Sequence, residues 1–211
     1  MARADGRLTA DLNPQDHGPQ DACGVIGIYA PGEEVSKLTY FGMYALQHRG
    51  QESAGMAVSD GRHMMVFKDM GLVSQVFDEA TLNSLQGHMA VGHTRYSTTG
   101  ASIWDNAQPT FRSRQGGDGL ALAHNGNLTN TGALEALIAE RAPDTEVPHK
   151  DRMDSSNDTS LVTALMTTYD GTLEEVAAQV LPPLQGAFSL VFMADHTLSS
   201  AGEPQGIRAW V

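Results

Sequence analysis

Hydrophobic and polar positions along the chain form short blocks with two different periods. In some blocks apolar residues are contiguous or alternate with polar ones, as in a β-strand, and CGVIGIYA at 23–30 is an example. In others they recur three and four residues apart, as on one face of a helix, and 34–48 is an example. Turn-forming dipeptides such as Pro31-Gly32 and Asp60-Gly61 separate the blocks. The pattern therefore predicts a chain that switches repeatedly between strands and helices.

The order of these blocks favours a mixed domain. Strands are expected over 23–30, 53–61, 62–69, 88–96, 119–126 and 187–194, with a last strand after Asp195-His196. Helices are expected over 34–48, 72–85, 131–141, 158–169 and 172–181, and polar loops over 97–109 and 142–155. Because strands cluster into hairpins and helices come in pairs, we expect an α+β layered domain.

Length and charge narrow the class of protein. A chain of 211 residues suits one domain, and it can bury enough apolar surface to fold without a disulfide or a metal. The 13 Lys and Arg against 25 Asp and Glu give a net charge of -12. Nucleic acids and anionic membrane surfaces bind basic footprints, so neither is an expected partner. No apolar run approaches the roughly 18 residues of a membrane span.

The first 22 residues differ in character from the rest. Residues 1–22 are polar and contain Pro14, Gly18 and Pro19, which predicts an irregular, solvated tail. No apolar run follows the early arginines, so this segment is not a secretory signal. The composition changes at Cys23, which we expect to be the first residue of the first strand.

Cys23 is the only cysteine. One thiol excludes an internal disulfide, a cysteine-based zinc site and a cysteine-ligated iron–sulfur cluster within the chain. A lone thiol is typical of a reduced, cytoplasmic protein, and by itself it is most often a small buried hydrophobe. His48, His93 and His124 lack the short spacing of metal ligands, so no metal and no cofactor are expected.

Four polar segments lie at predicted strand ends and loops, where chemistry is usually placed. They are Cys23-Gly24, HRGQESAG at 48–55, GHTRYSTTG at 92–100 with NAQP at 106–109, and HNGNLTN at 124–130. Each also has a purely structural interpretation. These interpretations are tight packing for Gly24 and Gly27, a helix C-terminus for His48-Arg49-Gly50, a surface strand position for Arg95, and a hairpin turn for Asn125-Gly126.

Taken together, the segments resemble a known family. From Cys23 to about Val191 the chain resembles the glutaminase domain of the amidophosphoribosyltransferase family of purine synthesis, a class II glutamine amidotransferase of the N-terminal-nucleophile hydrolase superfamily. The matching strings are CGVIGIYAP, LTYFGMYALQHRGQESAGMAV, GLVSQVF, VGHTRYSTTG, NAQPTF, LAHNGNLTN, NDTSLVTAL and GAFSLVFM. The related glucosamine-phosphate synthase branch has YRGYDSAG and HTRWATHG where this chain has HRGQESAG and HTRYSTTG.

This resemblance implies a fold and a processing step. It implies a four-layer αββα sandwich over residues 23–211. The tail is similar to that of actinobacterial members, which implies that 1–22 is a propeptide whose removal makes Cys23 the first residue. A free α-amine has a pKa of about 7.7–8.0 and can accept the thiol proton, so cleavage would be part of the mechanism. The alternative is a disordered tail whose retention is harmless.

The resemblance also implies roles for individual residues. Cys23 would be the nucleophile that forms a γ-glutamyl thioester, and Asn125 with Gly126 would form the oxyanion hole. Arg95 would bind the α-carboxylate of L-glutamine and Asp158 its α-ammonium group, although Asp158 could instead serve as a helix N-cap. The remaining residues that match the family's pocket are Arg49, Gly50 and Thr98.

Two stretches depart from the family pattern. Asn157-Asp158-Thr159-Ser160 stands where relatives have an S-D-[ST]-E string, so the aspartate is kept and the glutamate is not. Near the end, Gly202-Glu203 replaces an Arg-Asp pair and Ala209-Trp210 replaces Pro-Leu. No phosphoribosyltransferase domain, and hence no phosphoribosyl pyrophosphate site, follows within this sequence.

Three functions remain open at this stage. The chain could be a free-standing glutaminase that supplies ammonia to a partner synthase, a truncated amidotransferase, or a catalytically silent relative that binds glutamine or a partner protein. Retention of Cys23, Arg95, Asn125, Gly126 and Asp158 argues against the silent relative. An unrelated amidase of the superfamily is a weaker option. The expected partners are L-glutamine and an ammonia-accepting synthase domain or protein, and a homo-oligomer is left open.

Overall fold

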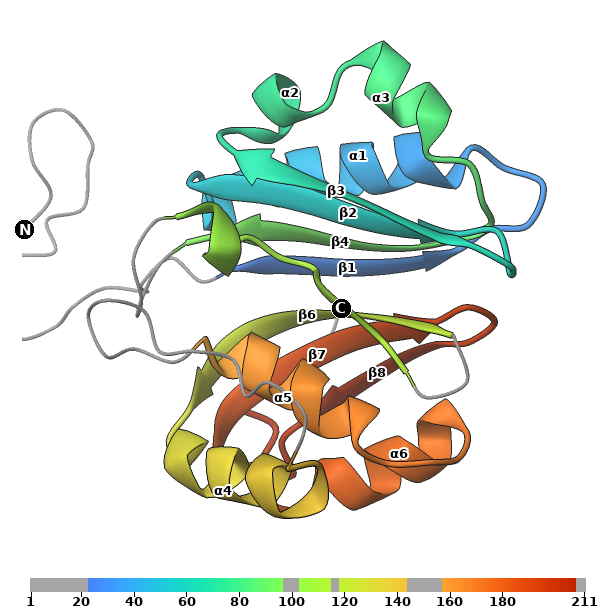
Figure 1. Cartoon of the computed structure of the whole chain (residues 1–211). Coiled ribbons are helices and arrows are strands. Elements are labelled where there is room, and N and C mark those ends of the chain that lie inside the picture. The colour runs from blue at the N-terminus through green and yellow to red at the C-terminus, as the bar shows by residue number, and fades with distance from the viewer. Residues whose placement is uncertain (1–22, 97–102, 115–117, 144–156, 208–211) are drawn as a thin grey trace, which may run out of the picture.

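The computed structural model describes residues 23–96, 103–114, 118–143 and 157–207 (Figure 1). Several subjects of the sequence predictions lie outside these residues. They are the tail at 1–22, residues 97–102 of the predicted loop at 97–109 with the pocket residue Thr98, most of the predicted loop at 142–155, and the altered pair Ala209-Trp210.

Two four-stranded antiparallel sheets form the centre of the molecule. The first has the order β1-β4-β2-β3 and contains β1 (Gly24–Tyr29), β2 (Ser53–Ser59), β3 (Met64–Met70) and β4 (Met89–Arg95). The second has the order β5-β6-β7-β8 and contains β5 (Thr110–Ser113), β6 (Gly119–Leu128), β7 (Gly186–Ala194) and β8 (Leu198–Gly202). The sheets face each other (Figure 1).

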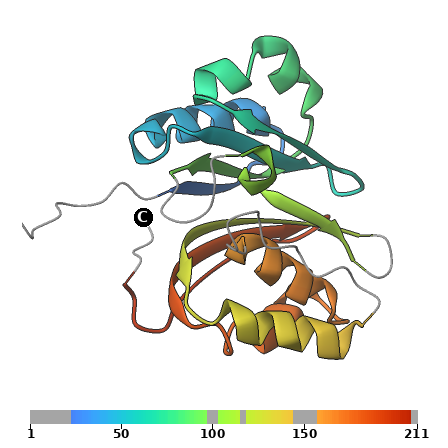
Figure 2. The same ribbon diagram turned by 60° about the vertical axis from the view of Figure 1, so that its left-hand side comes forward.

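Helices cover the outer face of each sheet (Figures 1 and 2). The first sheet carries α1 (Val35–Ala45), α2 (Val73–Val76) and α3 (Glu79–Ser84). The second carries α4 (Thr131–Arg141), α5 (Asp158–Thr167) and α6 (Leu173–Val180). Two short 3-10 turns, η1 (Gln47–Arg49) and η2 (Trp104–Asn106), lie in the connections. The expected four-layer αββα sandwich is confirmed.

The side chains of the strands alternate between two apolar layers. In β6, Leu120 and Leu122 pack against the helices of the second sheet, whereas Ala121 and Ala123 face the first sheet. The layer between the sheets combines alanines with valines and with Met89 and Met193. At Gly27, a Cβ atom would lie 2.8 Å from Cγ1 of Val191 in the opposite sheet. The packing interpretation of Gly27 is therefore correct.

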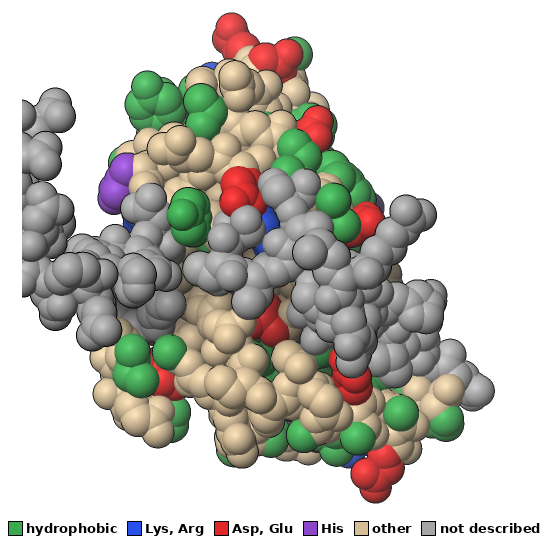
Figure 3. Space-filling view, turned by 90° about the vertical axis from the view of Figure 1, so that its left-hand side faces the viewer, with side chains coloured by type: hydrophobic (Ala, Val, Ile, Leu, Met, Phe, Trp, Pro, Cys, Tyr) green, Lys and Arg blue, Asp and Glu red, His purple; other side chains and the backbone are tan. Residues whose placement is uncertain are grey.

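Most predicted elements are present, with two corrections. The short strand β5 was not predicted, because it lies in the stretch between the predicted polar loop at 97–109 and the predicted strand at 119–126. The first strand begins at Gly24, and Cys23 precedes it. Within the described ranges, no helix has the length and apolar character needed to cross a membrane. On the face shown in Figure 3, acidic side chains are more prominent than basic ones, in keeping with the net charge of -12.

The buried face of the second sheet should dominate its stability. Phe192 is 1% exposed and Phe111 is 43% exposed. We predict that Phe192→Ala lowers the free energy of unfolding by about 3–5 kcal/mol because it leaves a cavity. Phe111→Ala, the matched control, should cost less than about 1 kcal/mol. Urea denaturation measures both values, and equal losses would contradict the layer assignment.

Candidate active site

The first sheet brings Cys23 to Arg95. In the antiparallel register of β1 and β4, Gly24 lies opposite Thr94, so the next step along both strands places Cys23 alongside Arg95. On the other side of β4, Arg95 lies opposite Ser53 of β2. The Cys23 thiol donates to the carbonyl oxygen of Tyr96 at 3.4 Å. One end of the inter-sheet layer therefore holds a thiol next to a guanidinium.

The second sheet places Asn125 at the same end. Asn125 lies opposite Ser189 of β7, and by strand alternation it shares the inter-sheet face of Ala123. Asn125-Gly126 is therefore strand, and the hairpin-turn interpretation is wrong. Gly126 has φ of 155°, and a Cβ atom there would lie 2.1 Å from the carbonyl oxygen of Ala187. Only glycine lets β6 approach β7 at this point.

Arg95 is a buried residue and not a surface strand residue. The residue is 7% exposed, its Nη1 donates to the carbonyl oxygen of Asn106 at 3.0 Å, and its Nε lies 3.8 Å from Oε2 of Glu52. These contacts hold the guanidinium plane in a fixed orientation. A buried, oriented guanidinium is suited to binding a carboxylate in a fork.

The chain that follows α1 packs against Cys23. Arg49, in η1, donates from Nε to the carbonyl oxygen of Cys23 at 3.4 Å. At Gly50, a Cβ atom would lie 2.5 Å from the carbonyl oxygen of Thr94, so glycine is needed where this segment passes β4. His48 contacts the carbonyl oxygen of Ala45 through Nδ1 at 3.0 Å, as expected for a basic residue at a helix end. The structural and the functional interpretation of this segment are thus compatible.

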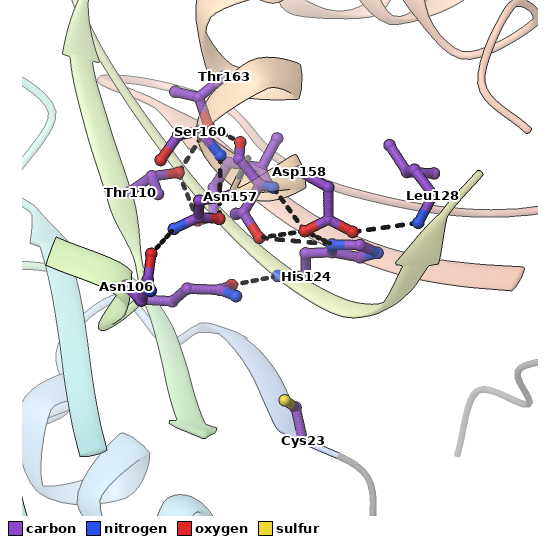
Figure 4. Close-up of polar contacts among 12 residues, drawn as sticks. Cys23, Asn106, Thr110, His124, Leu128, Asn157, Asp158, Ser160 and Thr163 are labelled. Carbon is purple, nitrogen blue, oxygen red and sulfur yellow. Dashed lines mark hydrogen bonds and ion pairs between the residues drawn. The ribbon is translucent and has the colours of Figure 1, made fainter. Parts of the chain in front are cut away.

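Asp158 begins α5 and is the centre of a polar network (Figure 4). Its Oδ1 accepts from the backbone N–H of Thr159 at 2.8 Å and lies 3.4 Å from Nδ1 of His124. Its Oδ2 accepts from the backbone N–H of Leu128 at 3.1 Å. The helix N-cap is Asn157, whose side chain accepts from the N–H of Ser160, so the N-cap role considered for Asp158 is wrong. In Figure 4, Cys23 stands apart from this network at the start of β1.

Burial and nearby charges set the protonation of the site. Burial raises the pKa of the Cys23 thiol, and Asp158 raises it further, while the hydrogen bond to Tyr96 and the charge of Arg95 act in the opposite direction. Burial also acts to raise the pKa of Asp158, but His124 and the two backbone N–H donors outweigh it and hold this pKa below its usual value. Asp158 is therefore ionised at neutral pH, and Cys23 needs a base to become a nucleophile.

His124 was considered at the sequence level only as a metal ligand. It is 2% exposed, and its contact with Asp158 joins strand β6 to helix α5, which no local pattern signals. Among the described residues, no group of three or more His, Cys, Asp and Glu side chains is arranged to hold a metal ion.

Comparison with known proteins identifies relatives of this chain. Amidophosphoribosyltransferase of Mycobacterium tuberculosis is 52% identical over 210 residues, which are 95% of this chain and 38% of that protein. The enzyme of the same name from Synechococcus elongatus is 46% identical over 217 residues, 97% of this chain and 41% of that protein. The chain corresponds to the glutamine amidotransferase part of amidophosphoribosyltransferases. No family model matches it.

A solved structure of the amidophosphoribosyltransferase family agrees with the fold. Glutamine phosphoribosylpyrophosphate amidotransferase from B. subtilis, complexed with ADP and GMP, matches with a TM-score of 0.74 and 34% identity over 87% of this chain and 38% of that chain. This similarity confirms the N-terminal-nucleophile hydrolase fold. The present chain spans well under half the length of these relatives, and it corresponds to their glutamine amidotransferase part.

One departure from the amidophosphoribosyltransferase pattern can be located. Glu203 follows β8 and is 5% exposed. Its carboxylate accepts from the backbone N–H groups of Phe188 and Ile207, and its own N–H donates to the carbonyl oxygen of Phe188 at 3.2 Å. Glu203 therefore binds the segment after β8 to β7. It does so although Gly202 stands before it, where the family pattern has an arginine.

The lowered pKa of Asp158 predicts a pH-dependent stability. An aspartate whose folded-state pKa is depressed stabilises the fold above its unfolded pKa of about 4, and this contribution is lost as the pH falls through the folded value. Asp158→Asn should therefore unfold more easily than the wild type at pH 7, and the difference should shrink below about pH 4. Urea denaturation between pH 7 and pH 3 measures this, with Asp170→Asn at an exposed position as the control. A constant difference would contradict it.

Proposed function

We propose that this chain, once Cys23 is its first residue, hydrolyses L-glutamine to glutamate and ammonia through a Cys23 thioester. The observation that carries the proposal is the meeting of Cys23, Arg95 and Asn125 at one end of the layer between the sheets. Those residues supply a nucleophile, a carboxylate ligand and an oxyanion donor. The similarity to the glutamine amidotransferase part of amidophosphoribosyltransferases supports glutamine as the substrate.

The first step is activation of the thiol. Because the pKa of Cys23 is raised, little thiolate exists at neutral pH while residue 23 is within a longer chain. Removal of 1–22 turns the nitrogen of residue 23 from an amide into an amine with a pKa of about 7.7–8.0. This amine accepts the thiol proton without a separate histidine. Proteolysis thus creates the general base.

Glutamine is held at its amino-acid end. Arg95 is already fixed by the carbonyl of Asn106, so it binds the α-carboxylate with little loss of side-chain freedom. Asp158 supplies the negative charge for the α-ammonium group, and its low pKa keeps that charge at neutral pH. The charge of Asp158 also acts to raise the pKa of the Cys23 thiol, which supports a carboxylate close to the reacting group.

The chemistry proceeds through two acyl transfers. The thiolate attacks the δ-carbonyl carbon, and the developing oxyanion accepts hydrogen bonds from the Asn125 side chain and the Gly126 N–H. The C–N bond breaks, the amine returns its proton to the leaving nitrogen, and ammonia departs. Water then attacks the thioester, which releases glutamate and restores the thiol. Loss of one oxyanion donor typically lowers the rate by about 10²–10³-fold.

The destination of the ammonia is a separate proposal. The chain spans 38% of the mycobacterial relative, so we assign the ammonia-consuming step to another synthase domain or protein. A catalytically silent relative that only binds glutamine is the alternative function. The two differ in whether Cys23 turns glutamine over.

Cys23 should be essential for turnover and not for folding. We expect purified protein to have lost 22 residues by intact mass and to release glutamate from glutamine. A chain in which Cys23 directly follows the initiator methionine should behave identically once that methionine is removed. Cys23→Ala should retain the melting temperature and lose glutaminase activity. Equal glutamate release by wild type and Cys23→Ala would contradict the mechanism.

Arg95 should act chiefly through substrate binding. Arg95→Lys keeps the charge and loses the planar fork, so the KM for glutamine should rise about 10–100-fold while kcat changes less. Arg114→Lys, which alters an arginine just after β5, is the matched control and should leave both constants unchanged. Steady-state kinetics with glutamate detection gives both constants. A loss confined to kcat would exclude the carboxylate-binding role.

A further inference from the structure

A buried histidine joins the two sheets beside the site. His93 of β4 is 0% exposed, and its Nε2 lies 3.2 Å from the backbone carbonyl oxygen of His124 in β6. A carbonyl oxygen can only accept, so Nε2 carries a proton, and in the neutral ring Nδ1 then carries none. Nδ1 of His93 is buried and has no hydrogen-bond partner among the described residues. The neutral His93 side chain therefore makes one hydrogen bond, as a donor through Nε2.

The carbonyl that His93 binds is one that the second sheet leaves unpaired. Strand β5 pairs with β6 only as far as Thr110 opposite Leu122. His124 lies two residues further, so its N–H and C=O point to the same side, where β5 has already ended. The side chain of Gln108 accepts from this N–H at 2.7 Å, and His93 donates to this C=O. Two side chains thus replace the missing strand.

The hydrogen bond from His93 to the carbonyl of His124 lies next to the residues of the proposed glutaminase chemistry. His93 lies two residues before Arg95 on the same face of β4, and His124 immediately precedes Asn125. The bond therefore fixes the spacing between the strand that carries Arg95 and the strand that carries the oxyanion donors. A second hydrogen bond between the sheets lies at the other end of the layer, where Ser59 donates to the carbonyl oxygen of Asp195 at 2.7 Å.

We propose that His93 is a positioning residue that sets the distance between the α-carboxylate site at Arg95 and the oxyanion hole at Asn125-Gly126. The proposal rests on the glutaminase function proposed above. Glutamine spans these two points, so its δ-carbonyl meets the oxyanion donors only when the strands are held at the correct separation. A displacement of about 1 Å at such a site can lower a rate about 10²-fold.

The electrostatics of His93 keep this donor unchanged. Burial lowers the pKa of His93 to about 3, and the positive charges of Arg95 and Lys68 and the ring of His124 also lower it. The imidazole is neutral over the pH range in which a glutaminase with an amine base would operate. The hydrogen bond from His93 therefore does not change with pH over this range.

Three substitutions separate a donor role from simple filling of space. His93→Gln places an amide N–H near the position of Nε2, His93→Asn has an amide that is too short to reach, and His93→Leu fills the space without a donor. We expect kcat for glutamine to fall about 10–100-fold in the Leu and Asn variants and less than about threefold in the Gln variant. KM should change little, because Arg95 and Asp158 remain.

The matched control is Ser59→Ala, which removes the hydrogen bond between the sheets at the far end. It should lower the melting temperature and leave kcat unchanged. Glutamine binding by calorimetry in a Cys23→Ala background should be the same with His93 and with His93→Leu, which separates binding from turnover. Together these measurements distinguish local positioning from general stability.

Each outcome decides between the interpretations. Wild-type kcat in His93→Leu overturns the positioning role. Equal loss of kcat and melting temperature in all three His93 variants, Gln included, also overturns it and leaves only a structural role. Absence of Cys23-dependent turnover in the wild type overturns the proposed function itself, and this is seen before any His93 variant is measured.

Discussion

The layer between the two sheets packs alanines such as Ala57, Ala121 and Ala123 with the larger Met89 and Met193, and this packing fixes how the two sheets lie against each other. Sheets that approach this closely leave no room for a large residue at Gly27, opposite Val191. At one end of the layer apolar side chains give way to polar ones. The packed apolar residues fix the strand register, and the register in turn fixes the positions of the polar residues at this end of the layer. The candidate site is thus an extension of the core and not a set of independent loops.

Burying polar groups at the end of an apolar layer is costly unless each one is bonded, and the backbone supplies most of the partners. Asp158 is held by the N–H groups of Leu128 and Thr159, and Arg95 by the carbonyl of Asn106. These fixed partners also pre-organise the site, because the side chains do not have to be ordered when a ligand binds. The same contacts that offset the cost of burial therefore prepare the groups for binding.

Local sequence patterns predicted much of the fold, since the strands and helices have clear apolar periods. They failed for β5, whose four residues are too short to show a period, and for Asn125-Gly126, whose turn-forming preference is overridden by pairing with β7. The family motifs identified the candidate site residues. The contacts of His93 with His124, and of His124 with Asp158, span more than thirty residues of sequence, so no local pattern could reveal them.

The protonation of Cys23 links the proposed chemistry to the proposed removal of residues 1–22. Burial raises the thiol pKa, and the carboxylate of Asp158, which we propose binds the substrate ammonium group, raises it further. Bound glutamine would place its α-ammonium group against that carboxylate and so reduce its effect on the thiol. Substrate binding and release of the amine at residue 23 then act in the same direction, each favouring the thiolate. In the proposed mechanism, the chain that still carries residues 1–22 is inactive for two reasons, because it lacks the amine base and because its thiol is protonated.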